Sequence, residues 1–267
     1  MARCENDEPI LTIRLRDRQD RSAAEVDGLS DAFGCPAVPN LRLLTSDLLV
    51  LDYLPGTPCR FEDLDIPQIE QLAHSLSCIH ETTYTRYTNW PERTMAQGSR
   101  ADLLRFRIRS LANFESYPAA REGRIHQTLP ELLDLLANPE ITDPSWDEAE
   151  FSRLHGDLSY GNLIWHDDEL ALIDWEYSRV GDPAEDLAYL LVEQGVSLEG
   201  AKSLRQAYID AEGEPEAWRR VPTYAVFAAV DSCLWWADYG AERDLPSADE
   251  IEARVATALN WIPLLDA

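Results

Sequence analysis

The stretch HGDLSYGNLIW, residues 155–165, joins a short polar loop to an apolar run that is typical of a buried strand. Asp157 and Asn162 lie five positions apart in the loop. Polar side chains that interrupt an otherwise apolar region serve either a turn or a chemical function. The residues that follow this stretch decide between the two interpretations.

A second apolar run, ALID at residues 171–174, follows the turn residues HDDE and predicts a β-hairpin. If position 165 pairs with position 171, Asn162 lies opposite Asp174. Asp157 lies on the loop that leads into the hairpin. We therefore expect the side chains of Asp157, Asn162 and Asp174 to converge at one end of the hairpin.

These three residues form a set that is suited to metal-assisted phosphoryl transfer. Asparagine and aspartate oxygens are hard ligands of the kind that Mg²⁺ binds, which favours Asn162 and Asp174 as metal ligands. A loop aspartate that the metal does not need can orient an acceptor hydroxyl and take its proton, which favours Asp157 as the catalytic residue. The alternative is a simple polar turn beside a buried strand.

Three stretches resemble the aminoglycoside phosphotransferase and choline kinase superfamily, which is related to the protein kinases. They are HGDLSYGNLIW, ALIDWEYSRVGDPAEDLAYLL at 171–191 and, more weakly, LLVLDYLPG at 48–56. The resemblance extends over nearly the whole chain and implies an α+β, protein-kinase-like two-lobed fold. It also implies ATP or GTP with Mg²⁺ as cofactors, and transfer of the γ-phosphate to a hydroxyl of an aminoglycoside, choline, another amino alcohol or a sugar. By this similarity Asp157 is the catalytic aspartate, while Asn162 and Asp174 hold magnesium.

The order of strands and helices fits two lobes. A strand is expected at 10–16, a helix at 22–34, and two strands around the turn 45–47. We predict a truncated N-terminal sheet lobe at 1–55 and a large helical C-terminal lobe at 56–267. The helices predicted for the second lobe begin near residue 66 and continue at 99–116, 127–137, 200–211, 222–239 and 248–260.

The resemblance implies a basic strand residue, paired with a helix glutamate, that holds the phosphates of the nucleotide. Arg14 and Glu25 occupy suitable positions. Arg16 on the same strand is a competing choice, and a plain surface arginine is the simpler alternative. Leu51 and Tyr53 belong to the segment that would form the hinge, whose backbone receives the adenine.

The N-terminal lobe departs from the family pattern because only nine residues precede its first expected strand and no glycine occurs before Gly28. We therefore expect the glycine-rich loop that covers the phosphates to be missing. Three explanations are open: the nucleotide site is open and weak, the start of the sequence is placed too late, or another chain covers the phosphates. A nucleotide-binding pseudokinase with a regulatory role is accordingly the alternative to an active kinase.

Two further segments have predicted roles. In GDPAEDLA, Asp182 and Glu185 fit a helix capping box, so we expect this segment to support the site, and we expect His155 to anchor the catalytic loop. In TYAVFAAVDSCLWWADYG, residues 223–240, a helix would place the side chains of Asp231, Trp235 and Asp238 on one face. That face could bind a cationic acceptor by charge and cation–π contact, although chance spacing and ordinary core packing are the alternatives.

The chain carries 49 acidic and 23 basic residues, a net charge of -26, and the acids are spread along its length. Such a surface repels nucleic acid and anionic membranes, so we expect neither as a partner and leave the oligomeric state open. Self-repulsion would destabilise the fold in dilute buffer and be screened in concentrated salt. We expect a halophilic type of protein, with an ordinary acidic protein as the alternative.

The five cysteines are odd in number, scattered, and never spaced C-x-x-C, so the sequence suggests neither a disulfide framework nor a zinc site. The start, MARCENDEPI, has no apolar signal core, and no apolar run is long enough to span a bilayer. These observations favour a cytoplasmic protein.

Overall fold

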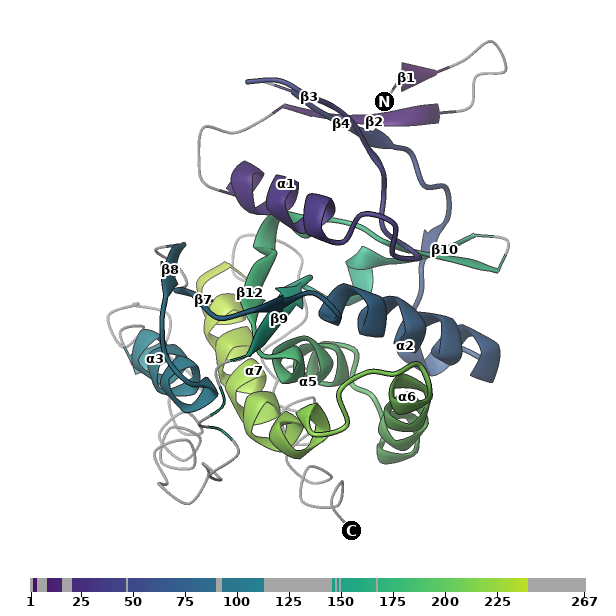
Figure 1. Ribbon diagram of the computed structural model, residues 1–267. Coiled ribbons are helices and arrows are strands. Elements are labelled where there is room, and N and C mark those ends of the chain that lie inside the picture. The colour runs from purple at the N-terminus through teal and green to yellow at the C-terminus, as the bar shows by residue number, and fades with distance from the viewer. Residues whose placement is uncertain are drawn as a thin grey trace.

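The structure is a computed structural model (Figure 1) that describes residues 2–3, 9–15, 21–46, 48–89, 93–112, 146, 148, 150–166 and 168–239. The N-terminal part contains strands β1 (Ala2–Arg3), β2 (Pro9–Leu15), β3 (Leu41–Leu44) and β4 (Leu48–Asp52), and helix α1 (Arg21–Asp31). The strands form an antiparallel sheet in the order β1-β2-β4-β3. Leu49 and Leu51 of β4 and Leu29 of α1 are buried in one apolar core, which explains why the helix packs below the sheet.

The larger part of the chain is mainly helical. Its helices are α2 (Ile66–His80), α3 (Arg100–Ala112), α5 (Pro183–Glu193), α6 (Leu198–Asp210) and α7 (Ala217–Tyr239), with 3₁₀ turns η1 (Phe61–Asp63), η6 (Tyr160–Asn162) and η7 (Trp175–Tyr177). Its strands are β5 (Thr57–Pro58), β6 (Thr83–Tyr84), β7 (Tyr87–Asn89), β8 (Thr94–Ala96), β9 (Phe151–Leu154), β10 (Leu163–His166), β11 (Glu169–Leu172) and β12 (Arg179–Gly181). They form small sheets in the orders β11-β10-β5, β12-β9-β6 and β7-β8. Within the described ranges, no helix combines the length and apolarity that crossing a bilayer requires.

Helix α5 lies at the centre of this lobe, because nearly all of its residues are buried and it packs along α7. A helix that is buried on all sides needs neighbours all round. Helix α7 and strand β9 provide them, together with His80 of α2 and Arg107 of α3. Its start is set by the expected capping box. The Asp182 side chain accepts the N–H of Ala184, and the Glu185 side chain accepts the N–H of Asp182. This start fixes the rotation of α5 and directs Asp186 toward the loop before β10.

The β10–β11 hairpin has a different register from the predicted one. Position 163 pairs with 172 and position 166 with 169, so a two-residue turn replaces the predicted four-residue turn. Asp168 in this turn has a φ of 67°, the left-handed conformation that a tight hairpin turn requires. The pairing is shifted by one residue, and Asn162 therefore lies opposite Ile173, whose N–H donates to the Asn162 carbonyl oxygen at 3.0 Å.

Most other predicted elements are present, with shifted ends. Helix α7 begins at Ala217 rather than at the predicted Pro222, because the buried side chains of Trp218 and Val221 pack its first turns onto the lobe. Strand β1, which was not expected, precedes β2 and pairs with it. The predicted helices at 127–137 and 248–260, and Arg16, lie outside the described residues. The division at residue 55 stays a prediction.

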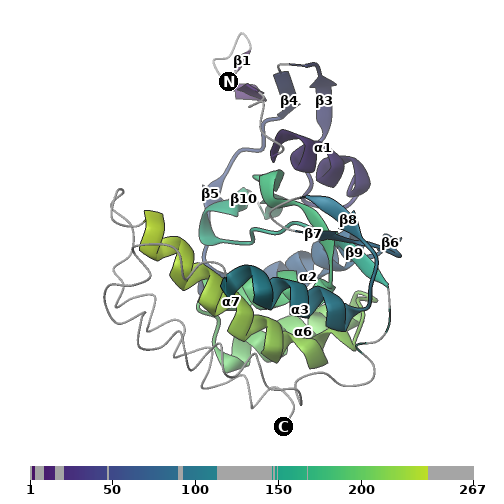
Figure 2. The same ribbon diagram turned by 90° about the vertical axis from the view of Figure 1, so that its left-hand side faces the viewer.

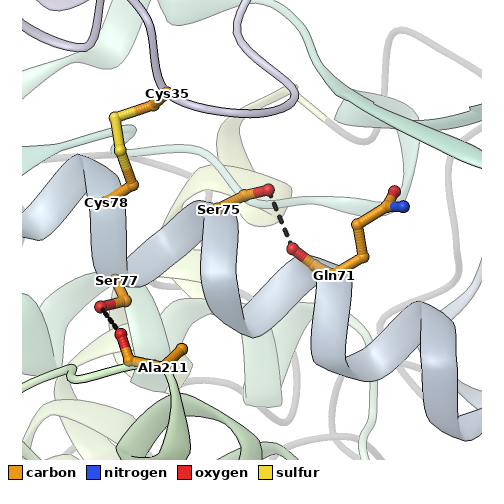
Figure 3. The surroundings of a disulfide bond; sticks show 6 residues. All are labelled: Cys35, Gln71, Ser75, Ser77, Cys78 and Ala211. Carbon is orange, nitrogen blue, oxygen red and sulfur yellow. Dashed lines mark hydrogen bonds between the residues drawn. A yellow bond between two sulfur atoms is a disulfide. The ribbon is translucent and has the colours of Figure 1, made fainter.

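Cys35 and Cys78 form a disulfide bond, which cysteine number and spacing did not suggest (Figure 3). Cys35 lies in the loop after α1, and Cys78 lies in the last turn of α2. Their Cα atoms are 5.6 Å apart although 43 positions separate them in the sequence. The pairing depends on how two distant elements pack, which cysteine spacing does not reveal.

Helix α1 lies between the four-stranded sheet and the larger lobe (Figures 1 and 2) and packs against η7. Gly28 makes this close approach possible. A Cβ atom at this position would lie 2.3 Å from Oγ of Ser178 and 3.0 Å from the ring of Trp175. Both of these residues are buried and so have little room to move away.

The variant Gly28→Ala is therefore expected to lose about 1–3 kcal/mol of stability through overpacking, although alanine is the better helix former. Chemical denaturation measures this loss. Ser30→Ala, at an exposed position of the same helix, is the matched control and should retain wild-type stability. A Gly28→Ala protein as stable as the control would show that α1 does not approach η7 this closely.

Candidate active site

The loop between β9 and β10 holds Asp157 and Asn162 side by side. The amide nitrogen Nδ2 of Asn162 donates hydrogen bonds of 2.9 Å to the carbonyl oxygen and to Oδ2 of Asp157. Because the amide nitrogen is engaged, Oδ1 is the atom of Asn162 that can bind a cation. Asn162 is buried and Asp157 is partly exposed, so the Asp157 carboxylate is accessible to a bound molecule.

The imidazole of His155 joins this loop to the chain segment before Asp174. The N–H of Asp157 donates to Nδ1 of His155 at 3.2 Å, which requires an unprotonated Nδ1. The ring proton then lies on Nε2, which donates to the carbonyl oxygen of Ile173 at 3.1 Å. Burial lowers the pKa of His155, while the charges of Asp186 and Asp157 act in the opposite direction, and the ring is neutral. His155 thus anchors the loop and has no free nitrogen for proton transfer.

The carboxylate of Asp186 holds the loop from the other side. It accepts the N–H of His155 at 2.7 Å and the N–H of Gly156 at 2.9 Å. It also lies 3.3 Å from Nε2 of His80, whose Nδ1 lies 2.9 Å from the hydroxyl of Tyr208. Burial by itself would raise the pKa of Asp186, but the hydrogen bond and charge of His80 hold it below its ordinary value. The loop is therefore fixed by an ionised carboxylate in the interior.

Asp174 follows β11 in a left-handed backbone conformation, with φ 65° and ψ 66°, and begins the η7 turn. Nη1 of Arg14 lies 2.6 Å from Oε1 of Glu25 and 3.0 Å from Oδ1 of Asp174. Burial raises the pKa of the Glu25 carboxyl, and the charge of Arg14 opposes this. At 2.6 Å the contact has the length of a charge-assisted hydrogen bond, so Arg14 and Glu25 form an ion pair. One guanidinium thus connects the sheet, helix α1 and the Asp174 segment.

The donor atoms of the site fit magnesium better than a metal that is held by protein alone. Among the residues that the structure describes, no group of three or more His, Cys, Asp or Glu side chains is arranged to hold a metal ion. Magnesium commonly binds one or two protein oxygens and completes its shell with phosphate oxygens and water. Oδ1 of Asn162 and the carboxylate of Asp174 could supply those protein oxygens.

The hinge residues lie where β4 ends. Leu51 is buried, whereas Tyr53, beyond the last strand residue, is partly exposed. Between them, the carboxylate of Asp52 accepts hydrogen bonds of 2.5 and 2.8 Å from Arg42. These contacts fix the strand end, and the adenine contact stays a prediction.

The three predicted acceptor residues belong to α7. The side chain of Asp231 is among those that the structure describes, whereas the side chains of Trp235 and Asp238 lie outside them. Asp231 is partly buried, and burial raises the pKa of its carboxyl. Burial also raises the pKa of Tyr189, with smaller contributions from the charges of Asp157 and Asp231.

Roles for Asp186 and His80 were not predicted from the sequence, although the sequence around Asp186 does contain an indication of its role. It is an acidic residue inside a helix that is otherwise largely apolar, and acidic residues are seldom fully buried without a partner. No local pattern indicates a role for His80, because its partner Asp186 is 106 positions away in the sequence.

A four-stranded sheet and one helix lie over a helical lobe, and Arg14 of the sheet reaches Asp174 of that lobe. Ile173, which precedes Asp174, bonds to His155 and Asn162 of the loop that carries Asp157. This arrangement is that of the protein-kinase-like class of phosphotransferase folds. The family described as "Phosphotransferase enzyme family" matches residues 17–224 of the chain. The chain belongs to this family. This confirms the family, the α+β fold and the class of enzyme that the sequence predicted.

Two relatives illustrate the similarity in sequence. Protein LicA of Haemophilus influenzae is 43% identical over 54 residues, so the match spans only 20% of that protein and 20% of this chain. Thiamine kinase of Escherichia coli K12 is 29% identical over 228 residues, which cover 83% of this chain and 72% of the kinase.

Solved structures share the fold. A choline/ethanolamine kinase family protein from Mesorhizobium loti has a TM-score of 0.63 at 18% identity, covering 96% of this chain and 82% of its own. A thermostable mutant of aminoglycoside phosphotransferase APH(4)-Ia, in a ternary complex with AMP-PNP and hygromycin B, has a TM-score of 0.63 at 15% identity, covering 94% of this chain and 86% of its own.

The neutral, buried His155 makes a prediction about pH. The unfolded chain binds a proton on His155 below pH about 6.5, whereas the folded protein resists it, so this residue makes stability fall as pH falls. The stability difference between wild type and His155→Gln should therefore shrink below pH about 6.5, by up to about 1.4 kcal/mol per pH unit. Denaturation of both proteins between pH 5 and 8 measures it, and the other histidines cancel in the comparison. A difference that does not change with pH would contradict the neutral assignment.

Proposed function

We propose that the protein is an ATP- and Mg²⁺-dependent phosphotransferase that moves the γ-phosphate to a hydroxyl of a small molecule. The observation that carries this proposal is a chain of contacts: the Arg14–Glu25 pair reaches Asp174, and the neighbouring Ile173 bonds to His155 and Asn162 of the loop that carries Asp157. The AMP-PNP in the complex of APH(4)-Ia, which shares the fold, supports an adenine nucleotide, with GTP as the alternative. Because such an enzyme needs a nucleotide pool, a cytoplasmic location is part of the proposal.

Asp157 would orient the acceptor hydroxyl and take its proton as phosphoryl transfer proceeds. The structure supports this role in two ways. Its carboxylate is partly exposed, and the loop beneath it is held by His155 and Asp186, so its position is defined before a ligand binds. A side chain fixed in this way need not be ordered when the acceptor arrives.

Asn162 and Asp174 would bind magnesium, which when bound neutralises negative charge on the phosphates. Arg14 would contact a phosphate while Glu25 holds its guanidinium in place. Since Arg14 lies 3.0 Å from Asp174, a phosphate on Arg14 would also lie close to the proposed metal ligand. Leu51 and Tyr53 would border the adenine.

The acceptor would lie between the catalytic loop and α7. Asp231 is a partly buried acidic residue of α7 and the proposed contact for the acceptor. A carboxylate there favours a cationic acceptor, such as an amino alcohol or an aminoglycoside, with Trp235 and Asp238 as further candidates. The related thiamine kinase, and the hygromycin B in the APH(4)-Ia complex, support a small molecule as acceptor.

The variant Asp157→Asn tests the catalytic assignment, because asparagine keeps the shape but cannot take a proton. Its turnover should fall by about 10²–10⁴, the usual contribution of a positioned general base, while nucleotide binding is kept. A nucleotide-consumption assay against amino alcohols, aminoglycosides and sugars measures turnover, and calorimetry with AMP-PNP and Mg²⁺ measures binding.

Asp168→Asn is the matched control, since Asp168 is an exposed aspartate in the turn at the far end of the same hairpin. It should behave like the wild type. Equal turnover of wild type and Asp157→Asn would sink the assignment of the base. Magnesium-dependent nucleotide binding by a wild type that phosphorylates no member of the acceptor panel would instead support the pseudokinase.

We also propose that the protein is adapted to concentrated salt. Its net charge is -26, and in dilute solution the excess carboxylates repel one another. The Debye length falls from about 10 Å at 0.1 M to about 3 Å at 1 M salt, so the repulsion is screened. The melting temperature should rise by about 5 °C or more between about 0.1 and 2 M KCl, which is the shift that about 2 kcal/mol produces in a protein of this size. An unchanged melting temperature would show an ordinary acidic protein.

A further inference from the structure

The end of helix α1 is attached to the larger lobe by polar contacts. The carboxylate of Asp31, the last residue of α1, accepts a hydrogen bond of 2.8 Å from Nε of Arg153 in β9 and another from the hydroxyl of Tyr84 in β6. A little further along, the carbonyl oxygen of Ala37 accepts the N–H of Leu172 in β11 at 2.8 Å. The helix is therefore tied to the lobe that carries the catalytic loop.

The Cys35–Cys78 disulfide makes the same attachment covalent (Figure 3). Cys35 lies between Asp31 and Ala37, so the disulfide is formed within the same segment that these two hydrogen-bonded residues attach to the larger lobe. Cys78 lies on α2, next to Ser77, whose hydroxyl donates to the carbonyl oxygen of Ala211 at 2.7 Å. The bond thus joins a loop of the sheet lobe to a helix that is firmly packed in the other lobe.

The position of α1 matters for the proposed nucleotide site. Glu25 lies on this helix and holds Arg14 at 2.6 Å, and Arg14 in turn reaches Asp174 at 3.0 Å. The same helix packs at Gly28 against Ser178, in the segment that follows Asp174. A shift of α1 would therefore change the spacing of the groups proposed to meet the phosphates.

We propose that the Cys35–Cys78 bond is a redox-controlled tether that sets how firmly α1 is held over the Asp174 segment. This inference rests on the proposed function for its effect on activity. Both cysteines are partly exposed, which gives a small thiol or disulfide access to the bond. Oxidation fixes the loop and so holds Glu25 in place, whereas reduction leaves α1 with its non-covalent contacts alone.

The chemistry is thiol–disulfide exchange with a low-molecular-weight disulfide, RSSR. One cysteine thiolate attacks RSSR and releases RS⁻, which gives a mixed disulfide. The second cysteine thiolate attacks the protein sulfur of that mixed disulfide and releases another RS⁻. The two cysteines are oxidised by two electrons, RSSR is reduced to two thiols, and the protons of the cysteines pass to the released thiolates or to solvent.

The expected effect is graded rather than complete, because Asp31, Leu29 and Ala32 still attach α1 after reduction. If α1 is correctly placed in about a tenth to a third of reduced molecules, the KM for nucleotide rises about three- to tenfold. The kcat at saturating nucleotide should change by less than about twofold, because binding then restores the correct position.

The experiment uses the full chain with Cys4→Ser, Cys59→Ser and Cys233→Ser, so that only Cys35 and Cys78 remain. Oxidised and reduced samples, with their thiols counted by alkylation and mass spectrometry, are compared in two ways. Amide hydrogen exchange of residues 21–31 without nucleotide should be faster in the reduced sample, and the KM for nucleotide should be higher.

Two variants sharpen the test. Adding Cys35→Ser and Cys78→Ser to this background should reproduce the reduced behaviour and abolish the response to redox conditions. Asp31→Asn weakens the polar contacts of Asp31 that remain after reduction, so it should enlarge the effect of reduction. Equal hydrogen exchange of α1 in both redox states overturns the tether. Faster exchange without any turnover in either state would instead mean that the tether exists and the proposed activity fails.

Discussion

The buried carboxylate of Asp186 is the contact on which the site depends. Two consecutive backbone N–H groups, of His155 and Gly156, point at this one side chain, which fixes the turn of the chain that delivers Asp157. Removing a carboxylate from water is costly, and this cost is offset by the two N–H donors together with His80. Since Asp186 lies on the central helix α5, the core of the larger lobe, and not its surface, sets the position of the loop that carries Asp157.

The interior of this acidic protein uses arginine to neutralise buried acids. Arg220 forms a two-pronged contact with Asp182, at 2.7 and 3.0 Å, and also reaches Glu214 at 3.0 Å. Arg100 in α3 contacts Glu214 as well, so α3, α7 and the start of α5 share one network. Breaking such a buried pair costs about 3–5 kcal/mol because a charge is left without its partner. The network thereby holds α5, and with it Asp186, in one orientation.

Local sequence patterns predicted much of this arrangement, because the turns, strands and helix caps concerned depend on interactions between residues that are close in the sequence. The Asp157 to Asn162 spacing, the apolar runs of the hairpin and the capping box before α5 all concern residues a few positions apart. The predicted register of the hairpin is wrong because a left-handed Asp168 permits a turn that is shorter than the four residues predicted. A single-residue error of this kind moves Asp174 relative to Asn162.

Long-range contacts escaped the sequence for a different reason. Cys35 meets Cys78, and Asp186 meets His80, only because separate helices pack together, and neither pair has a recognisable spacing. The link from Arg14 to Asp174 crosses 160 positions, and the resemblance to a family, not the pattern of residues, suggested Arg14. The acceptor residues predicted on α7 rest on a shared helical spacing alone, and such a spacing does not say which part of the protein that helix face contacts.

The most direct test of the account is a crystal structure of the protein with Mn²⁺ and AMP-PNP, in which anomalous scattering locates the metal. The account predicts a metal peak within about 2.5 Å of both Oδ1 of Asn162 and a carboxylate oxygen of Asp174, against the phosphates and facing Asp157. A bound nucleotide whose metal touches neither side chain would contradict it.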